Sequence, residues 1–190
     1  MSLGRRRLTC LALPALVAGC GASPDPVLYT LQMKPGPVLP SGPRVVQLRD
    51  IGLASYLDRR EIVRSSADYK LGVMANDWWG EPLGSLLSRI IILGLSQRLP
   101  NSRIYAEGGA ISADPNAVVG VNIQRMDRDA SGSLELIAQG AVEFNRPARW
   151  ASRAFHIVKA PPTNTVAGQV AATSDAIAEL TDGLATLLQP

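Results

Sequence analysis

Two stretches of the 190-residue chain place apolar side chains three and four positions apart. Residues 82–100 carry leucines and isoleucines at this spacing between Pro82 and Pro100, which predicts a helix bounded by these two prolines. Residues 165–188 carry one apolar stripe, which predicts a second helix that packs by a single face. The first helix is apolar on nearly all sides. We therefore expect it to lie between a sheet and a second cover, either the preceding Pro-rich segment or another subunit.

Elsewhere, apolar positions alternate with polar ones, which is the period of a half-buried strand. The longest runs lie on either side of the turn-forming residues 129–132, so we expect them to pair antiparallel with one buried face. A hairpin that turns at Ala67-Asp68 is also expected. The pattern predicts a single α/β domain with a mixed, largely antiparallel sheet and two principal helices. The expected strands are residues 27–31, 44–48, 61–66, 69–74, 103–106, 119–124, 134–144 and 149–158.

The amino terminus has the residue order of a bacterial lipoprotein signal. Residues 5–7 are arginines, residues 8–17 are mostly apolar, and the small residues Ala18 and Gly19 lead to Cys20. The apolar stretch is shorter than the roughly 20 residues that span a bilayer. A cysteine thiol is nucleophilic enough to accept a diacylglyceryl group. We therefore expect residues 1–19 to be removed as a signal peptide and Cys20 to be acylated, the alternative being an ordinary secretory signal with an incidental cysteine.

The segment after the cleavage site is rich in proline. We interpret residues 20–43 as a lipidated cysteine followed by a semi-extended tether, and residues 44–190 as the folded domain that it holds off a membrane. Gly21 stands where an aspartate would retain a lipoprotein at the inner membrane in enterobacteria-like sorting. The expected location is therefore the periplasmic face of the outer membrane.

Charge and cysteine content narrow the possible functions. The chain has 19 basic and 16 acidic side chains, and three of the basic ones are the arginines of the expected signal peptide. The remainder is therefore neutral, so the high isoelectric point is no evidence for nucleic-acid binding. The two cysteines are Cys10, which would leave with the signal, and Cys20, so no disulfide is expected.

The catalytic motifs that a sequence can reveal are missing. The chain contains no nucleophile elbow, no phosphate-binding loop and no dinucleotide fingerprint. Its single histidine, His156, lies in an expected strand, where a packed or half-exposed side chain is the usual role. One histidine and one acylated cysteine cannot form an ordinary zinc site. We therefore expect no enzyme activity, no metal and no cofactor other than the covalent lipid.

Two aromatic and charged segments are the candidate partner-binding residues. Aromatic residues and arginine dominate interface hot spots, so their exposure beside charged groups would favour a docking patch. A structural role is the alternative: Asp58 would cap a turn or pair with an arginine, and one tryptophan would cover the end of the sheet. The candidate residues are Tyr56, Leu57, Asp58, Arg59, Trp78, Trp79, Glu81 and Pro82.

An ordered series of short motifs resembles the ABC-type transport auxiliary lipoproteins, the PqiC-like family associated with MCE proteins. The series covers essentially the whole mature chain, although Arg60 and the paired tryptophans depart from the usual family pattern. Its members are Cys20, Tyr29-Thr30-Leu31, Tyr56-Leu57-Asp58-Arg59, Ile62-Val63-Arg64, Trp79-Gly80-Glu81-Pro82-Leu83, Val170-Ala171-Ala172 and Ala176-Ile177.

The resemblance implies a non-catalytic accessory subunit of an envelope system that moves lipids or other hydrophobic compounds, with an MCE-domain protein as its partner. Two alternatives remain from the residues themselves. A tethered small domain also suits a regulatory lipoprotein that activates a cell-wall synthase, and an apolar helix over a sheet also suits a lipid-binding periplasmic carrier. Self-association through the apolar helix at residues 82–100 is a further expectation.

Overall fold

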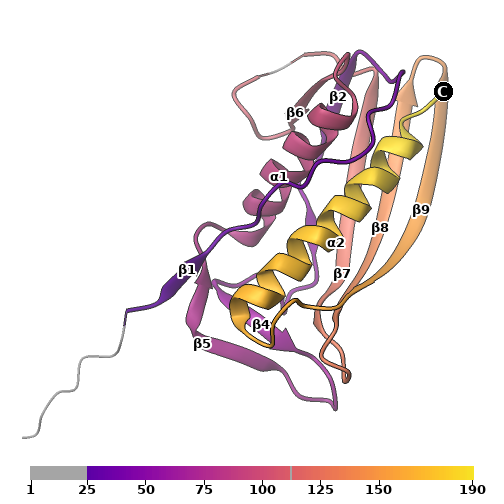
Figure 1. Ribbon diagram of the computed structural model, residues 1–190. Coiled ribbons are helices and arrows are strands. Elements are labelled where there is room, and N and C mark those ends of the chain that lie inside the picture. Colours follow the sequence, from indigo (N-terminus) through magenta and orange to yellow (C-terminus); the bar gives the residue numbers. More distant parts are fainter. Residues whose placement is uncertain (1–24, 112) are drawn as a thin grey trace, which may run out of the picture.

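The computed structural model describes residues 25–111 and 113–190, so the signal peptide and Cys20 lie outside the described residues. Nine strands form one mixed sheet, and two helices lie side by side on one of its faces (Figure 1). The predicted α/β class, with a largely antiparallel sheet and two helices, is confirmed. The elements in chain order are β1 (Val27–Tyr29), β2 (Val45–Leu48), β3 (Gly52–Leu53), β4 (Glu61–Ser65), β5 (Gly72–Trp79), α1 (Leu83–Arg98), β6 (Arg103–Ala106), β7 (Ala117–Arg128), β8 (Leu134–Asn145), β9 (Ala148–Lys159) and α2 (Val166–Leu187).

Strand β7 is the centre of the sheet. On one edge it pairs antiparallel with β8, which pairs antiparallel with β9. On its other edge the short strands β2, β3 and β4 pair parallel with successive parts of it. The outer strands follow from these: β6 pairs parallel with β2, β5 antiparallel with β4, and β1 parallel with β5. Strand β3 is only two residues long, too short for its alternation to be recognised in the sequence.

Both predicted helices form, with one face of each buried. Helix α1 follows Pro82 and ends at Arg98, two residues before Pro100, where the sequence predicted its end. Helix α2 is capped by Thr165, whose side chain accepts a hydrogen bond from Gly168 N at 3.1 Å. The two helices approach closely where Gly94 meets Thr181, because a Cβ on Gly94 would lie 3.0 Å from the threonine methyl group. Gly94 therefore allows the helix contact at a position where its low helix propensity would otherwise be a disadvantage.

The predicted tether is packed onto the domain over most of its described length. Residues 31–42, which we call the strap, cross the two helices on the side away from the sheet (Figure 1). Leu31 is buried in the core, and backbone groups of the strap bond to both helices: Gln32 N donates to Ser174 Oγ at 3.2 Å and Leu39 N to Arg98 O at 2.7 Å. The tether interpretation is therefore wrong for these residues. Their prolines extend the chain, but the apolar residues between them pack on the helices.

The strap is the second cover that the apolar pattern of α1 predicts. Leu86, Leu87 and Ile91 are fully buried against the sheet and α2, while the strap covers the side above. This packing accounts for the apolar surface that suggested self-association, so the helix itself no longer requires a second subunit. Leu93 remains exposed on α1.

Candidate functional site

Strand pairing brings the two candidate segments to the same end of the sheet. The backbone N–H of Trp79 donates to Arg60 O at 2.8 Å, and Glu61 is the register partner of Trp78. Strand β1 lies alongside, because Gly80 N donates to Tyr29 O at 2.8 Å. The end of β5, the start of α1 and the turn before β4 are therefore neighbouring segments, and we call their accessible candidate residues the docking patch. We define it by its exposed or half-buried members Tyr56, Asp58, Arg59, Trp78, Glu81 and Pro82.

Two of the predicted partner-binding residues do not belong to this surface. The side chain of Leu57 is only 2 % exposed and that of Trp79 only 7 % exposed, and both lie in the hydrophobic core. The expectation that they contact a partner is wrong because burial in the core stabilises large apolar side chains more than exposure does. Both side chains have a structural role in the core.

Polar atoms of three patch residues already have partners within the domain. The Tyr56 hydroxyl donates to Asp127 Oδ2 at 2.7 Å, and the indole N–H of Trp78 donates to Ala75 O at 3.0 Å. Glu81 pairs with Arg89, whose Nη2 lies 2.5 Å from Glu81 Oε1 and also donates to Thr30. These contacts fix the shape of the patch and join β1, β5 and α1 at its edge.

Asp58, Arg59 and Pro82 are the exposed members of the patch. Neither Asp58 nor Arg59 forms a side-chain hydrogen bond or ion pair with another residue in the part of the chain that the structure describes. The turn cap and internal ion pair that would give Asp58 a structural role are therefore not found there. Two exposed opposite charges, in a turn whose following strand pairs with Trp78, are a feature that can bind a partner by charge pairing.

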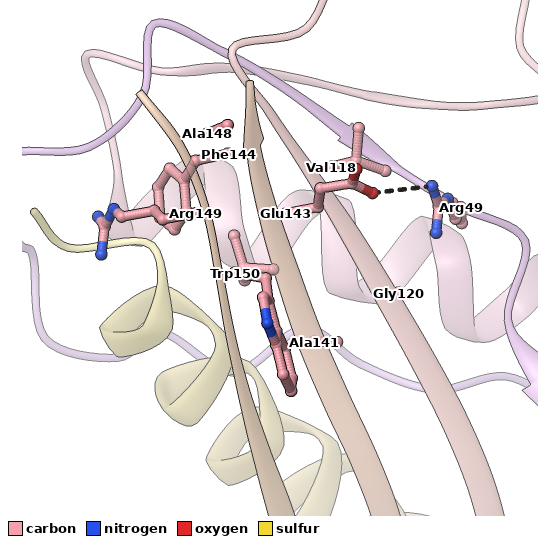
Figure 2. Close-up of a pocket in the computed structure, with 10 residues that line it drawn as sticks. Arg49, Val118, Gly120, Ala141, Glu143, Phe144, Ala148, Arg149 and Trp150 are labelled. Atoms are coloured by element: carbon pink, nitrogen blue, oxygen red, sulfur yellow. Dashed lines mark hydrogen bonds and ion pairs between the residues drawn. The ribbon is translucent and has the colours of Figure 1, made fainter. Parts of the chain in front are cut away.

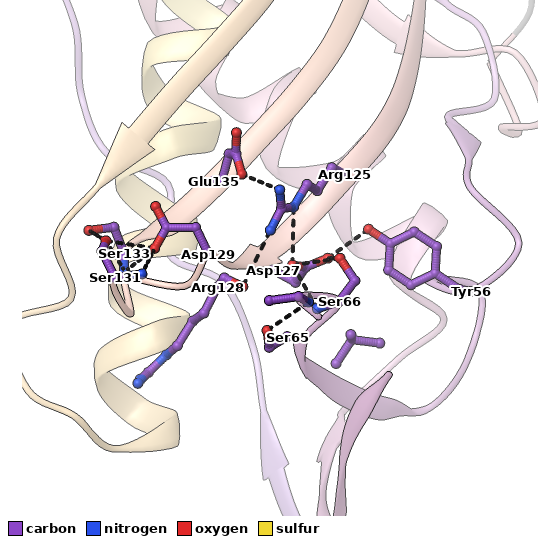
Figure 3. Close-up of polar contacts among 12 residues, drawn as sticks. Tyr56, Ser65, Ser66, Arg125, Asp127, Arg128, Asp129, Ser131, Ser133 and Glu135 are labelled. Atoms are coloured by element: carbon purple, nitrogen blue, oxygen red, sulfur yellow. Dashed lines mark hydrogen bonds and ion pairs between the residues drawn. The ribbon is translucent and has the colours of Figure 1, made fainter. Parts of the chain in front are cut away.

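A buried polar cluster supports the patch from behind (Figure 3). Asp127 is fully buried and accepts hydrogen bonds from Tyr56, from Arg125 Nε at 3.2 Å, and from the Ser66 hydroxyl, whose nearest contact is 2.8 Å. Burial, followed by the bond to Asp127, raises the pKa of Tyr56 above its ordinary value, so the phenol stays protonated and donates. Arg125 in turn pairs with Glu135. The cluster holds the turn after β3 against β7 and so positions Tyr56.

The sequence carried little signal for this cluster. Strand β7 alternates up to Ile123, and an irregularity between Ile123 and Arg125 then shifts the register so that Met126 and Asp127 are both buried. The single histidine lies at the outer end of the same chain of contacts, where His156 Nε2 is 2.8 Å from Glu135 Oε1. Its side chain is exposed and its partner is one carboxylate, an arrangement typical of a surface pair.

A second surface feature is a groove on the outer face of β7, β8 and β9, opposite the helices (Figure 2). It has a volume of about 510 Å³ and a floor of small residues that includes Gly120 and Ala141. Trp150, which is 74 % exposed, lies along it, and the ion pair of Arg49 with Glu143 borders it at 3.2 Å. The groove has no local signal in the sequence, because its residues come from β7, β8, β9 and the residue after β2.

The described residues contain no cluster of histidine, cysteine or acidic side chains arranged to hold a metal ion. In the same part of the chain, no helix is both long and apolar enough to cross a bilayer.

Comparisons with known proteins identify a family and a shared fold. No curated protein matches it. Two crystal structures share its fold. One, of an uncharacterised protein, has a TM-score of 0.72 at 16 % identity and covers 87 % of this chain and 100 % of its own. The other is of protein XCC0632 from Xanthomonas campestris, described under the family label DUF330. It has a TM-score of 0.69 at 17 % identity, and the match covers 85 % of this chain and 94 % of the XCC0632 chain.

The family assignment rests on the match across the folded domain. The family described as ABC-type transport auxiliary lipoprotein component matches residues 29–185, which span the strap, strands β2 to β9, α1 and all but the last two residues of α2. This range begins at Tyr29, so the strap belongs to the family's domain, as its packing requires. The chain is a member of the ABC-type transport auxiliary lipoprotein family.

Proposed function

We propose that this protein is a non-catalytic subunit of an MCE-containing, ABC-type transport system for lipids or other hydrophobic compounds, anchored at the periplasmic face of the outer membrane. The observation that carries the proposal is the family match over residues 29–185, together with the lipoprotein signal that ends at Cys20. In this account the docking patch binds the periplasmic MCE-domain protein of the system.

Acylation supplies the membrane attachment. Each buried CH₂ group contributes about 0.8 kcal/mol, so two or more acyl chains hold a protein stably at a bilayer. The chain after the signal peptide has no net charge, so electrostatic attraction to anionic lipid adds little to its membrane affinity. Replacement of Cys20 by serine should therefore release the folded domain into the soluble periplasmic fraction and abolish its contribution to transport. A variant that is fully active without its anchor would contradict the proposal.

The docking patch offers one positive and one negative side chain that the domain does not use internally. A partner with the complementary arrangement would pair with Asp58 and Arg59 while covering the ring of Trp78. Charge pairs of this kind contribute chiefly to specificity and association rate. Reversal of both charges, by Asp58→Lys with Arg59→Glu, should therefore weaken binding without unfolding the domain, because both side chains are exposed. The matched control is Arg103→Glu, an exposed charge on β6 at the other end of the sheet.

In-cell photo-crosslinking identifies the partner directly. A photo-reactive amino acid at Asp58 or Pro82 should capture an MCE-domain protein, whereas the same group at Ala110, in the loop before β7, should not. Capture of a peptidoglycan synthase from the patch would instead support a regulatory lipoprotein. Co-purification of a bound lipid with the isolated protein, and no protein captured from the patch, would support a lipid carrier.

A further inference from the structure

We propose that strand β1 and the tip of the β4–β5 hairpin form a membrane-contacting surface that rests on the bilayer holding the acylated Cys20. The inference depends on the anchoring part of the proposed function but not on the transport partner. It names the face of the domain that meets the lipid.

The length of chain between the anchor and the fold restricts how the domain can be oriented. Six residues separate Cys20 from Val27, the first residue of β1, and an extended chain over the seven Cα–Cα steps between them reaches about 25 Å at most. A domain of this size has a radius of gyration of about 15 Å and is therefore on the order of 40 Å across. The link is shorter than the domain, so the end that carries β1 stays next to the bilayer.

No further chain can be released to lengthen this link while the domain stays folded. Strand β1 is paired with β5, and the strap that follows is fastened at several points. Arg98, only 1 % exposed, binds Asp182 at 2.5 Å, and its guanidinium lies against the strap at Gly36. The side-chain amide of Gln97 forms two hydrogen bonds with the same glycine: its Oε1 accepts from Gly36 N at 2.8 Å, and its Nε2 donates to Gly36 O at 3.1 Å. The strap therefore fixes the point at which the lipid anchor meets the fold.

Exposed apolar side chains lie on two elements that border β5, one at each of its ends. Val27 and Leu28 of β1 are 53 % and 63 % exposed. Strand β1 pairs with the last residues of β5, and the hairpin tip lies at the opposite end of that strand, so β5 connects the two elements along one edge of the molecule (Figure 1). At the tip, Tyr69 is fully exposed and Leu71 is 44 % exposed. Tyrosine favours the headgroup region of a bilayer, with its ring in the apolar layer and its hydroxyl toward water.

The backbone at the tip indicates that the exposed aromatic is retained for a reason other than folding. Asp68 and Tyr69 adopt φ values of 55° and 59°, the left-handed region that a hairpin turn of this type usually fills with asparagine or glycine. A bulky residue is rare there, and such positions cluster where function over-rides local preference. Two basic side chains, Arg64 and Lys70, and one acidic side chain, Asp68, are exposed near the tip. Their net charge is positive, so anionic headgroups are not repelled.

Depth-dependent fluorescence quenching tests the surface on the lipidated full chain. Tyr69→Cys, labelled with an environment-sensitive dye, is reconstituted into phosphatidylethanolamine–phosphatidylglycerol vesicles with or without brominated acyl chains. Because Cys20 is consumed by its thioether, the introduced thiol is the labelled one. We expect the dye at position 69 to lose at least half of its intensity in brominated vesicles. The matched control, Ala110→Cys in the loop between β6 and β7, should lose less than a tenth.

Equal signals from positions 69 and 110, in protein that floats with the vesicles, would overturn the membrane-contacting surface and leave the anchor and the transport role intact. Protein that does not float would overturn the anchoring on which both rest. A benzophenone amino acid in place of Tyr69 adds an independent readout in cells. Phospholipid adducts support the proposal, and capture of a protein in their place would assign the tip to a protein interface instead.

Discussion

Gly36 is the position where a single methyl group should loosen the strap. It lies where the strap crosses the end of α1, and a Cβ there would fall well inside contact distance of both Arg98 Nη2 and Asp182 Oδ1. The guanidinium is almost completely buried and paired with Asp182, so it has little room to move. Gly36→Ala must therefore lift the strap or break the ion pair.

The size of the effect follows from the contacts that are lost. Lifting the strap removes the two hydrogen bonds between Gln97 and Gly36, at 2.8 and 3.1 Å. At about 1 kcal/mol each, the loss is roughly 2 kcal/mol. For a domain of this length that corresponds to a fall in Tm of about 4–8 °C. Disruption of the Arg98–Asp182 pair would add to it, although Asp182 is partly solvated and its charge can rehydrate.

Urea unfolding of the mature chain carrying Cys20→Ser, followed by circular dichroism, measures this difference. The matched control is Gly120→Ala in β7, where an added Cβ meets nothing within 4 Å and should leave stability unchanged or raise it slightly. Hydrogen exchange should also show faster exchange of the Gly36 and Leu39 amides, which bond to α1. If the two alanine variants unfold within about 0.5 kcal/mol of each other, the strap is not held as described.

Three further substitutions test the core, the buried cluster and the hairpin tip. Trp79→Ala should lower the free energy of unfolding by about 3–5 kcal/mol because it leaves a cavity in the core. The exposed Trp150 is the control, and Trp150→Ala should change the free energy of unfolding by less than about 0.5 kcal/mol. Similar losses for the two variants in urea titrations would contradict the assigned burial. The raised pKa of Tyr56 means that its contribution is fully present below about pH 10 and declines at higher pH. Tyr56→Phe should therefore cost about 1–3 kcal/mol at pH 7 and reduce the loss of stability between pH 10 and 12, and an unchanged alkaline slope would argue against the bond to Asp127. Tyr69→Gly should raise the free energy of unfolding by about 1 kcal/mol, since glycine relieves the left-handed backbone, and a lower Tm would refute the strain.

The architecture of the domain was predictable wherever periodicity was long enough to read. The strands on either side of residues 129–132 and both helices follow directly from alternating and helical spacing. The two-residue strand β3 left no pattern of its own. The strap was misinterpreted because prolines indicate an extended chain but do not say whether it packs. Leu31, Met33 and Leu39 were the signal that it does.

The partner-binding role of the candidate residues stays a prediction, and the burial of each residue was only partly predictable. Aromatic and charged residues marked two segments, which the β4–β5 pairing brings together. Composition could not say which of two adjacent tryptophans faces the core, because that depends on strand register. The buried charges Arg98 and Asp127 were not recognised. Arg98 pairs with Asp182, 84 positions away, and Asp127 binds Tyr56 and Ser66, 71 and 61 positions away, so no local pattern reveals these contacts.

The attachment of lipid at Cys20 links the family, the strap and the proposed orientation, and intact-mass analysis of protein purified from native membranes tests it most directly. The account predicts a mature chain that begins at Cys20, lacks residues 1–19 and carries the added mass of a diacylglyceryl group, with any further acyl chain on the new amino terminus. A mature chain with an unmodified cysteine, or one cleaved at another position, would contradict the anchoring and the orientation that follows from it.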